Sequence, residues 1–118
     1  METKTDSEVY SQSSQAITVF ITTASEDEAS AIGRAVVGQR LAACANILAL
    51  NKSIFEWEGK ICEEPEFLMI VKSRLDLFEE LAVVVKGLHS YKVPEIVAMP
   101  IIAGSRDYLN WVMENTRK

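Results

Sequence analysis

Cysteine, histidine and glycine are scarce in this chain of 118 residues, and each shortage excludes a kind of site. The two cysteines, Cys44 and Cys62, are too few for a disulfide framework and do not form a Cys-x-x-Cys pair. No glycine-rich loop is present to cradle a phosphate, and the one histidine, His89, belongs to no ordered Ser/His/Asp set. We therefore expect two reduced, buried thiols and a protein that is not an enzyme, without catalytic residues.

A basic surplus, a membrane span and a secretion signal are also missing. The net charge is −5, whereas nucleic-acid binding needs a basic stripe that displaces counterions from phosphates. No apolar run reaches the length of a bilayer, and the N-terminus carries acidic residues where a signal peptide needs an apolar core. We expect a cytoplasmic protein with a disordered arm over residues 1–15 and one globular domain over residues 16–118.

The first strand and the first helix are marked by local patterns. Residues 17–23 are rich in β-branched side chains and predict a strand. Ser25 and Glu28 have the spacing of a capping box, in which the serine accepts a bond from one free amide and Glu28 reaches back to another. A helix should follow and end near residues 38–40.

A long hairpin is expected next. Residues 41–57 are strand-like with a polar interruption at 51–53, and Glu58-Gly59 is a hairpin turn signal. The return strand covers residues 60–71. Both cysteines fall inside these two predicted strands.

The rest of the chain predicts a helix, a strand and a helix. Ser73 and Asp76 repeat the capping spacing at the start of the second helix, which should stop around His89. Residues 96–99 form a fourth strand that meets Pro100, a residue tolerated only where no neighbouring strand needs its amide, so this strand should be an edge.

The order β-α-β-β-α-β, followed by a terminal helix over residues 106–115, is the α+β pattern of ferredoxin-like split βαβ sandwiches. That fold covers one face of a four-stranded sheet with helices and leaves the other face bare. Residues 67–71 are apolar without alternation, which predicts burial on both faces. We therefore expect self-association through the uncovered sheet face and the long hairpin.

Five segments carry a family resemblance and cover nearly the whole chain in order, from about Ile17 to Val112. They are Arg40-Leu41-Ala42-Ala43-Cys44-Ala45-Asn46, Trp57-Glu58-Gly59-Lys60, the run ending in Lys72, His89-x-Tyr91-x-x-Pro94-Glu95, and Tyr108-Leu109-x-Trp111. Together they resemble the CutA family, the divalent-cation tolerance proteins. The resemblance implies a ferredoxin-like homotrimer whose long hairpins pair between neighbours, with a cleft at each subunit boundary.

The resemblance also implies a function. The family is linked to tolerance of copper and other divalent ions in bacteria and, in animals, to the anchoring of acetylcholinesterase at the membrane. Its architecture looks like that of the PII signalling proteins, whose trimers bind small ligands in boundary clefts. Our primary expectation is a trimeric divalent-metal (copper) tolerance or response protein that binds rather than catalyses and has no nucleic-acid or membrane partner. The alternative is a PII-like small-ligand-sensing or protein-anchoring scaffold.

His89 is the one candidate metal ligand, because imidazole is a common ligand for copper and zinc. In the bacterial members credited with copper binding, the resemblance places the donors at a strand-one cysteine and two adjacent histidines. Ile21, Leu88 and His89 occupy those places here, and Ser90 replaces the usual proline. Two interpretations stay open: a ligand for copper or another divalent metal, or a hydrogen-bonded histidine at the end of a helix.

A second set of residues suits the cleft of a trimer. Its aromatic wall, one cation and one carboxylate would fit a small polar or anionic ligand, and its members are Trp57, Lys72, Tyr91, Glu95 and Trp111. The opposing interpretation is packing, with Lys72 paired to Glu95 across a subunit boundary. An enzyme that uses Lys72 and Glu95 is the weakest interpretation, because no nucleophile or oriented base accompanies them.

Overall fold

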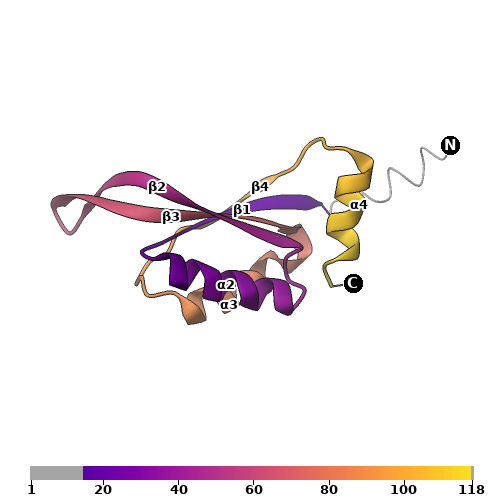
Figure 1. Ribbon diagram of the computed structural model, residues 1–118, viewed down its shortest axis with the longest axis horizontal. Coiled ribbons are helices and arrows are strands. Elements are labelled where there is room, and N and C mark those ends of the chain that lie inside the picture. Colours follow the sequence, from indigo (N-terminus) through magenta and orange to yellow (C-terminus); the bar gives the residue numbers. More distant parts are fainter. Residues whose placement is uncertain (1–14, 118) are drawn as a thin grey trace.

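The structure is a computed structural model that describes residues 15–117. Four strands form one antiparallel sheet in the order β2-β3-β1-β4, and helices α2 and α3 lie side by side on one face of it (Figure 1). The elements are β1 (Ala16–Thr23), α2 (Glu26–Gly38), β2 (Cys44–Trp57), β3 (Lys60–Arg74), a single 3₁₀ turn η2 (Leu75–Leu77), α3 (Phe78–Leu88), β4 (Ile96–Pro100) and α4 (Arg106–Glu114). This confirms the predicted α+β ferredoxin-like arrangement, with β4 at an edge. Residues 1–14 of the predicted arm lie outside the described part of the chain.

The two main helices begin differently from one another. α2 starts as predicted, because the Ser25 side chain accepts a hydrogen bond from the Glu28 amide at 3.1 Å. The prediction that Ser73 caps the second helix is wrong. Ser73 is a buried residue of β3, and its hydroxyl donates to the carbonyl of Leu41 at 2.6 Å. Because strand pairing continues to Arg74, one 3₁₀ turn intervenes and α3 begins only at Phe78.

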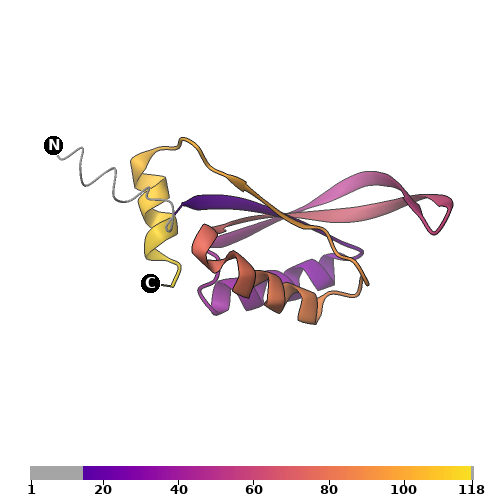
Figure 2. The same ribbon diagram turned by 180° about the vertical axis from the view of Figure 1, so that it is seen from behind.

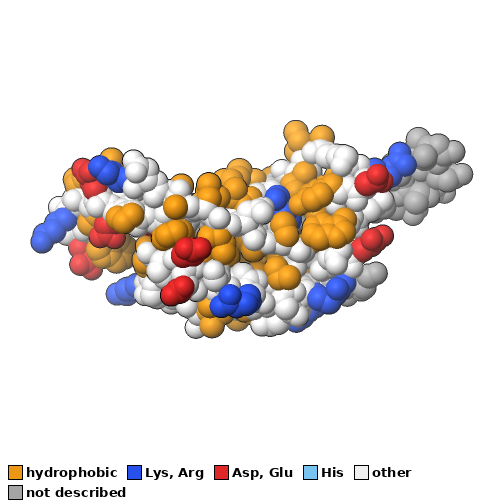
Figure 3. All heavy atoms as spheres, in the orientation of Figure 1, with side chains coloured by type: hydrophobic (Ala, Val, Ile, Leu, Met, Phe, Trp, Pro, Cys, Tyr) orange, Lys and Arg blue, Asp and Glu red, His pale blue; other side chains and the backbone are white. Residues whose placement is uncertain are grey.

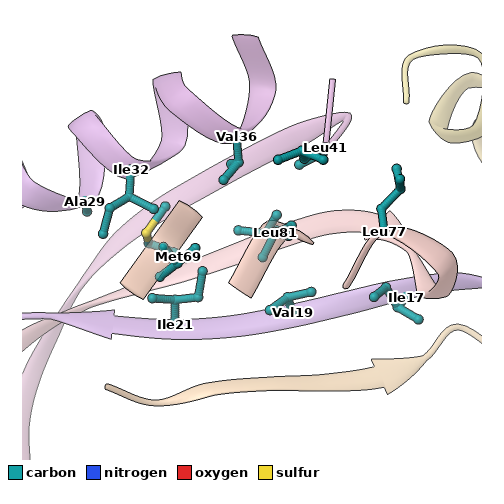
Figure 4. Close-up of a cluster of buried hydrophobic side chains, with 13 residues drawn as sticks. Ile17, Val19, Ile21, Ala29, Ile32, Val36, Leu41, Met69, Leu77 and Leu81 are labelled. Atoms are coloured by element: carbon teal, nitrogen blue, oxygen red, sulfur yellow. The ribbon is translucent and has the colours of Figure 1, made fainter. Parts of the chain in front are cut away.

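The hydrophobic core fills the space between the sheet and the two helices (Figure 4). Alternate residues of β1 and β3 point into it, which is the period of two that a strand covered on one face must show. The larger fully buried side chains there are Ile17, Ile21, Ile32, Met69 and Leu81. Leu68 and Ile70 alternate with the buried positions and are only partly covered. A single chain thus covers one face of residues 67–71, and burial of the other face stays a prediction that depends on self-association.

The sheet face opposite the helices is apolar and uncovered in a single chain. The register places Leu48, Val97 and Met99 on this open face, and their side chains are 42%, 46% and 43% exposed. Hydrophobic side chains are conspicuous along the sheet and toward the α4 end in the space-filling view (Figure 3). A single chain thus leaves uncovered the surface that the sequence predicts for self-association.

The hairpin of β2 and β3 extends well beyond the rest of the sheet, at the end of the molecule opposite α4 (Figures 1 and 2). β1 stops at Thr23, which pairs with Phe67, so the hairpin continues as a two-stranded ribbon and the molecule measures 56 × 24 × 21 Å. The predicted turn is confirmed: Glu58 and Gly59 have φ of 52° and 81°, as a two-residue hairpin turn requires. The polar interruption predicted within the strand is an irregularity of the register between Leu50 and Ser53.

Among residues 15–117, no helix combines the length and the apolar character that crossing a membrane requires.

Candidate functional site

A cleft of about 870 Å³ lies beside the hairpin ribbon. One wall comes from β2 and β3, and the other comes from the segment between α3 and β4, residues 90–95. The cleft exists because β3 continues past the end of β1, which leaves one side of β3 without a strand partner. Three of the five residues predicted for a cleft are found in its lining: Trp57, Tyr91 and Glu95.

His89 holds the start of the 90–95 segment in place. Its side chain is fully buried, its Nε2 bonds the carbonyl of Thr22 at 2.7 Å, and its Nδ1 accepts a bond from the Tyr91 amide at 3.0 Å. Since a carbonyl can only accept and an amide can only donate, the ring is the neutral tautomer with its proton on Nε2. Both ring nitrogens are already used, so a metal ion could bind His89 only by replacing one of these bonds.

Glu28 is the second anchor of the same segment. Its carboxylate accepts bonds from both the amide and the hydroxyl of Ser90, and it lies 3.7 Å from Nδ1 of His89. The predicted capping box is therefore only half present. The Glu28 amide bonds Ser25 as expected, but its carboxylate reaches a residue 62 positions away and not the start of its own helix.

Tyr91 and Glu66 form a hydrogen-bonded pair in the lining of the cleft. The Tyr91 hydroxyl donates to the Glu66 carboxylate at 2.5 Å, and Glu66 is only 7% exposed. Burial raises the pKa of the Tyr91 phenol above its ordinary range, and the bond to Glu66 and the carboxylates of Glu64 and Glu28 raise this pKa further. Tyr91 therefore acts as a hydrogen-bond donor throughout the neutral pH range.

The cleft combines aromatic surface with an excess of negative charge. Phe55 and Trp57 line it with side chains that are 38% and 44% exposed. Four carboxylates and one ammonium group also line it: Glu58, Glu64, Glu66, Glu95 and Lys92. The cation that the sequence predicts for this group, Lys72, is not among them.

Lys72 and Trp111 lie in a second group of residues, away from the cleft. Lys72 pairs with Thr18 and Cys44 in the sheet and donates to the Asn46 side chain at 3.4 Å. Trp111 packs against Tyr108 on α4, with ring centroids 5.7 Å apart. A single chain therefore does not join Lys72 to Glu95, and their pairing across a subunit boundary stays a prediction.

The two cysteines differ from expectation in burial. Both are unpaired and lie in strands as predicted, but both are partly exposed and not buried. The Cys62 thiol lines the cleft, whereas the Cys44 thiol lies 3.9 Å from the Tyr108 hydroxyl. Burial raises the pKa of Tyr108, and its contact with Cys44 adds to that effect. Within the described part of the chain, no three His, Cys, Asp or Glu side chains are grouped as metal donors.

Sequence reasoning missed Glu66 and the role of the Glu28 carboxylate. Glu66 stands immediately before the apolar run of β3, and a carboxylate next to such a run is a signal for a buried, hydrogen-bonded acid. Its partner, Tyr91, is 25 positions away, so no local spacing connects the two.

Comparison with known proteins gives concordant matches. The family model described as CutA1 divalent ion tolerance protein matches residues 17–115. A relative from Thermus thermophilus, "Divalent-cation tolerance protein CutA", is 49% identical over 98 residues, which are 83% of this chain and 95% of that protein. The human "Protein CutA" is 43% identical over 97 residues, 82% of this chain but 54% of that longer protein.

Solved structures agree with the sequence matches. The structure of the Thermus thermophilus protein has a TM-score of 0.84 at 47% identity and covers 86% of this chain and 99% of that chain. The CutA1 structure from Oryza sativa has a TM-score of 0.85 at 34% identity and covers 90% of this chain and 98% of that chain.

Proposed function

The chain belongs to the CutA1 divalent ion tolerance protein family, and on that premise we propose that it is a homotrimeric, cytoplasmic protein of divalent-metal tolerance or response. The relatives' names support the metal role. The observation that carries self-association is the open apolar face of the sheet, with Leu48, Val97 and Met99 each more than 40% exposed, and the number three is what the family resemblance implies. The proposed role is binding and not catalysis.

Self-association is the first part of this proposal to test. Light scattering and sedimentation at micromolar concentration should give three times the chain mass of 13.1 kDa. A particle of one chain mass would contradict the trimer and leave the open face without an explanation.

Copper or another divalent ion is the proposed metal ligand, with His89 as the candidate donor. Titration calorimetry with Cu²⁺ and Zn²⁺ should give saturable heats that weaken in His89→Ala. Because His89 is buried and its loss could disturb the fold, the electron paramagnetic resonance spectrum of Cu²⁺ bound to the unchanged protein is the second measurement. Nitrogen hyperfine splitting from one imidazole would support His89, whereas a spectrum of oxygen donors alone would remove it from the metal site.

A second candidate function is that of a PII-like small-ligand-sensing or protein-anchoring scaffold. The observation that favours it is the cleft itself, whose volume of about 870 Å³ is within the usual range for small-molecule sites. A thermal-shift screen of metabolites against the parent and Trp57→Leu would test it. A ligand that stabilises the parent and not the variant supports a cleft site, and the absence of any such ligand favours packing.

A further inference from the structure

We infer that Glu28 is a second metal donor beside His89, so that a divalent ion such as Zn²⁺ binds between the Glu28 carboxylate and Nδ1 of the imidazole. The inference rests on the proposed metal function, which names His89 alone as a donor. The first turn of α2, which carries Glu28, lies against the end of α3, which carries His89. Neither residue lines the cleft beside the hairpin, and neither lies on the open face of the sheet. The site is therefore compatible with self-association through those surfaces.

The hydrogen bonds of His89 match those of a metal-binding imidazole. A histidine that binds a metal through one ring nitrogen commonly donates the proton of the other nitrogen to a carbonyl or a carboxylate, which fixes the tautomer and the orientation of the ring. Nε2 of His89 donates to the carbonyl of Thr22 at 2.7 Å, which leaves the lone pair on Nδ1. The buried ring is thus held with its basic nitrogen toward Glu28.

The distance between the two donor atoms suits one ion. Oε2 of Glu28 lies 3.7 Å from Nδ1 of His89. An ion bonded to both atoms at about 2.1 Å with a tetrahedral angle holds them roughly 3.4 Å apart, so a small movement of either side chain is enough. The Glu28 side chain is 14% exposed whereas that of His89 is fully buried, so an ion reaches the imidazole past the carboxylate.

Metal binding exchanges hydrogen bonds that both donors already make. Nδ1 accepts from the Tyr91 amide at 3.0 Å, and the Glu28 carboxylate accepts from the amide and the hydroxyl of Ser90. These hydrogen-bond donors are neutral, so a divalent cation is a stronger partner for the carboxylate charge than they are. The ion therefore competes with the start of the 90–95 segment for the same two side chains, and its binding should loosen that segment.

Glu28 supplies what the donor positions implied by the family resemblance lack. Ile21 and Leu88 occupy two of those three positions, and neither hydrocarbon side chain can bind a metal. One imidazole nitrogen and one carboxylate oxygen suit Zn²⁺ or Cu²⁺, whereas Cu⁺ prefers the sulfur of thiolates and thioethers. With two protein donors, water takes the remaining positions around the ion, so we expect weaker binding than at a structural site with four protein ligands.

Titration calorimetry of the full chain with Zn²⁺ tests the role of Glu28. Glu28→Gln should weaken Zn²⁺ binding about tenfold, because the charged donor is lost. The amide oxygen of the new side chain can still accept from Ser90, so the 90–95 segment keeps its anchor. Glu26→Gln is the matched control, because it removes the same charge from an exposed position in the same turn of α2. It should bind Zn²⁺ within about twofold of the parent, since water and salt screen an exposed charge.

Ser90→Ala distinguishes a metal donor from a residue that only holds the segment. This change removes the hydroxyl that competes for the Glu28 carboxylate, so Zn²⁺ should bind at least as tightly as it binds the parent. Proton–nitrogen correlation NMR of the imidazole is the second readout, and the chain has one histidine to observe. Zn²⁺ should shift the Nδ1 signal of the parent and leave the proton on Nε2.

Equal affinities of the parent and Glu28→Gln would overturn the inference, as would equal weakening in Glu28→Gln and Ser90→Ala. Loss of the Nε2 proton on addition of Zn²⁺ would also overturn it, because that nitrogen faces Thr22 and not Glu28. These three outcomes leave the proposed metal function intact, since the parent still binds Zn²⁺. If the parent gives no saturable heat with Zn²⁺ or Cu²⁺, the proposed metal function fails and this inference fails with it.

Discussion

His89, Glu28, Tyr91 and Glu66 join the 90–95 segment to the sheet and to α2. His89 is neutral because a carbonyl and an amide occupy its two nitrogens. Glu28 holds Ser90, and Tyr91 holds Glu66. The wall of the cleft is therefore positioned by hydrogen bonds, and removing one partner costs most where the other is buried, as Glu66 is.

Replacing Tyr91 by phenylalanine should destabilise the protein. The change leaves the Glu66 carboxylate, 7% exposed, without its donor, and such a loss costs about 1–3 kcal/mol. Tyr108→Phe is the matched control, because the one polar partner of its hydroxyl among residues 15–117 is the Cys44 thiol, at 3.9 Å. Urea unfolding of both variants measures the difference, and equal free energies of unfolding would show that the Glu66 bond contributes nothing.

Alkaline pH should destabilise the protein partly through Tyr91. Its raised pKa means that the folded chain keeps the phenol proton at pH values where the unfolded chain has lost it. The contribution of Tyr91 to the free energy of unfolding is fully present below about pH 10, the ordinary pKa of tyrosine. It is lost as the pH rises from there toward the pKa of Tyr91 in the folded chain.

The measurement is the free energy of unfolding on either side of about pH 10. It should fall more steeply in the parent than in Tyr91→Phe. Tyr108, whose pKa is also raised, is present in both proteins and does not affect the comparison. Parallel pH profiles would exclude Tyr91 as the cause.

At the scale of elements, Gly59 and Gly87 differ in backbone conformation but not in the space around them. An added Cβ would meet nothing within 4 Å at either position, but only Gly59 has a positive φ, of 81°. Gly59 completes the turn of the long hairpin, and Gly87 lies in the last turn of α3.

The two alanine variants should change stability in opposite directions. Gly59→Ala forces a side chain into the left-handed region and should cost about 1 kcal/mol. Gly87→Ala improves helix propensity without a clash and should add about 0.5–1 kcal/mol. Urea unfolding measures both, and a shift of the same sign in the two variants would refute the conformational explanation.

The sequence predicts well those elements whose signals lie within a few neighbouring residues. The alternation in β1, the serine cap of α2 and the Glu58-Gly59 turn each depend on neighbouring residues. The start of α3 does not depend on neighbouring residues alone, because the Ser73 hydroxyl donates to the carbonyl of Leu41, 32 positions away, and does not cap the helix. A local capping pattern cannot reveal that competing demand.

At the scale of the whole molecule, the open sheet face should decide assembly. Leu48→Lys places a charge on that face, where it would be buried between copies but solvated in a single chain, so the trimer should dissociate while the chain stays folded. Val83→Lys is the control, since Val83 is 69% exposed on α3, away from that face. Light scattering measures the dissociation of the trimer, and circular dichroism measures whether the chain stays folded. A trimer that survives Leu48→Lys would place the contact elsewhere.

The candidate site was predictable only in part, because it depends on which ends of the strands meet. Trp57, Tyr91 and Glu95 share a cleft, but Lys72 lies opposite Thr18 while Glu95 leads into Ile96, the partner of Ile21. Three to four residues along a strand amount to about 10–13 Å, too far for an ion pair. Family resemblance identified these residues as a group, and the register of the sheet shows why one chain divides them.

The pairing of β1 with β4 sets an order of events for folding. The β2–β3 hairpin needs only its two-residue turn, and hairpins of this kind form in about 1–10 μs. Pairing Ile17 with Pro100 brings together residues from opposite ends of the chain, which costs conformational entropy before any strand hydrogen bond forms. This pairing should therefore form last. A chain emerging from the ribosome can therefore fold its hairpin early, yet it cannot complete its sheet until Pro100 has been added.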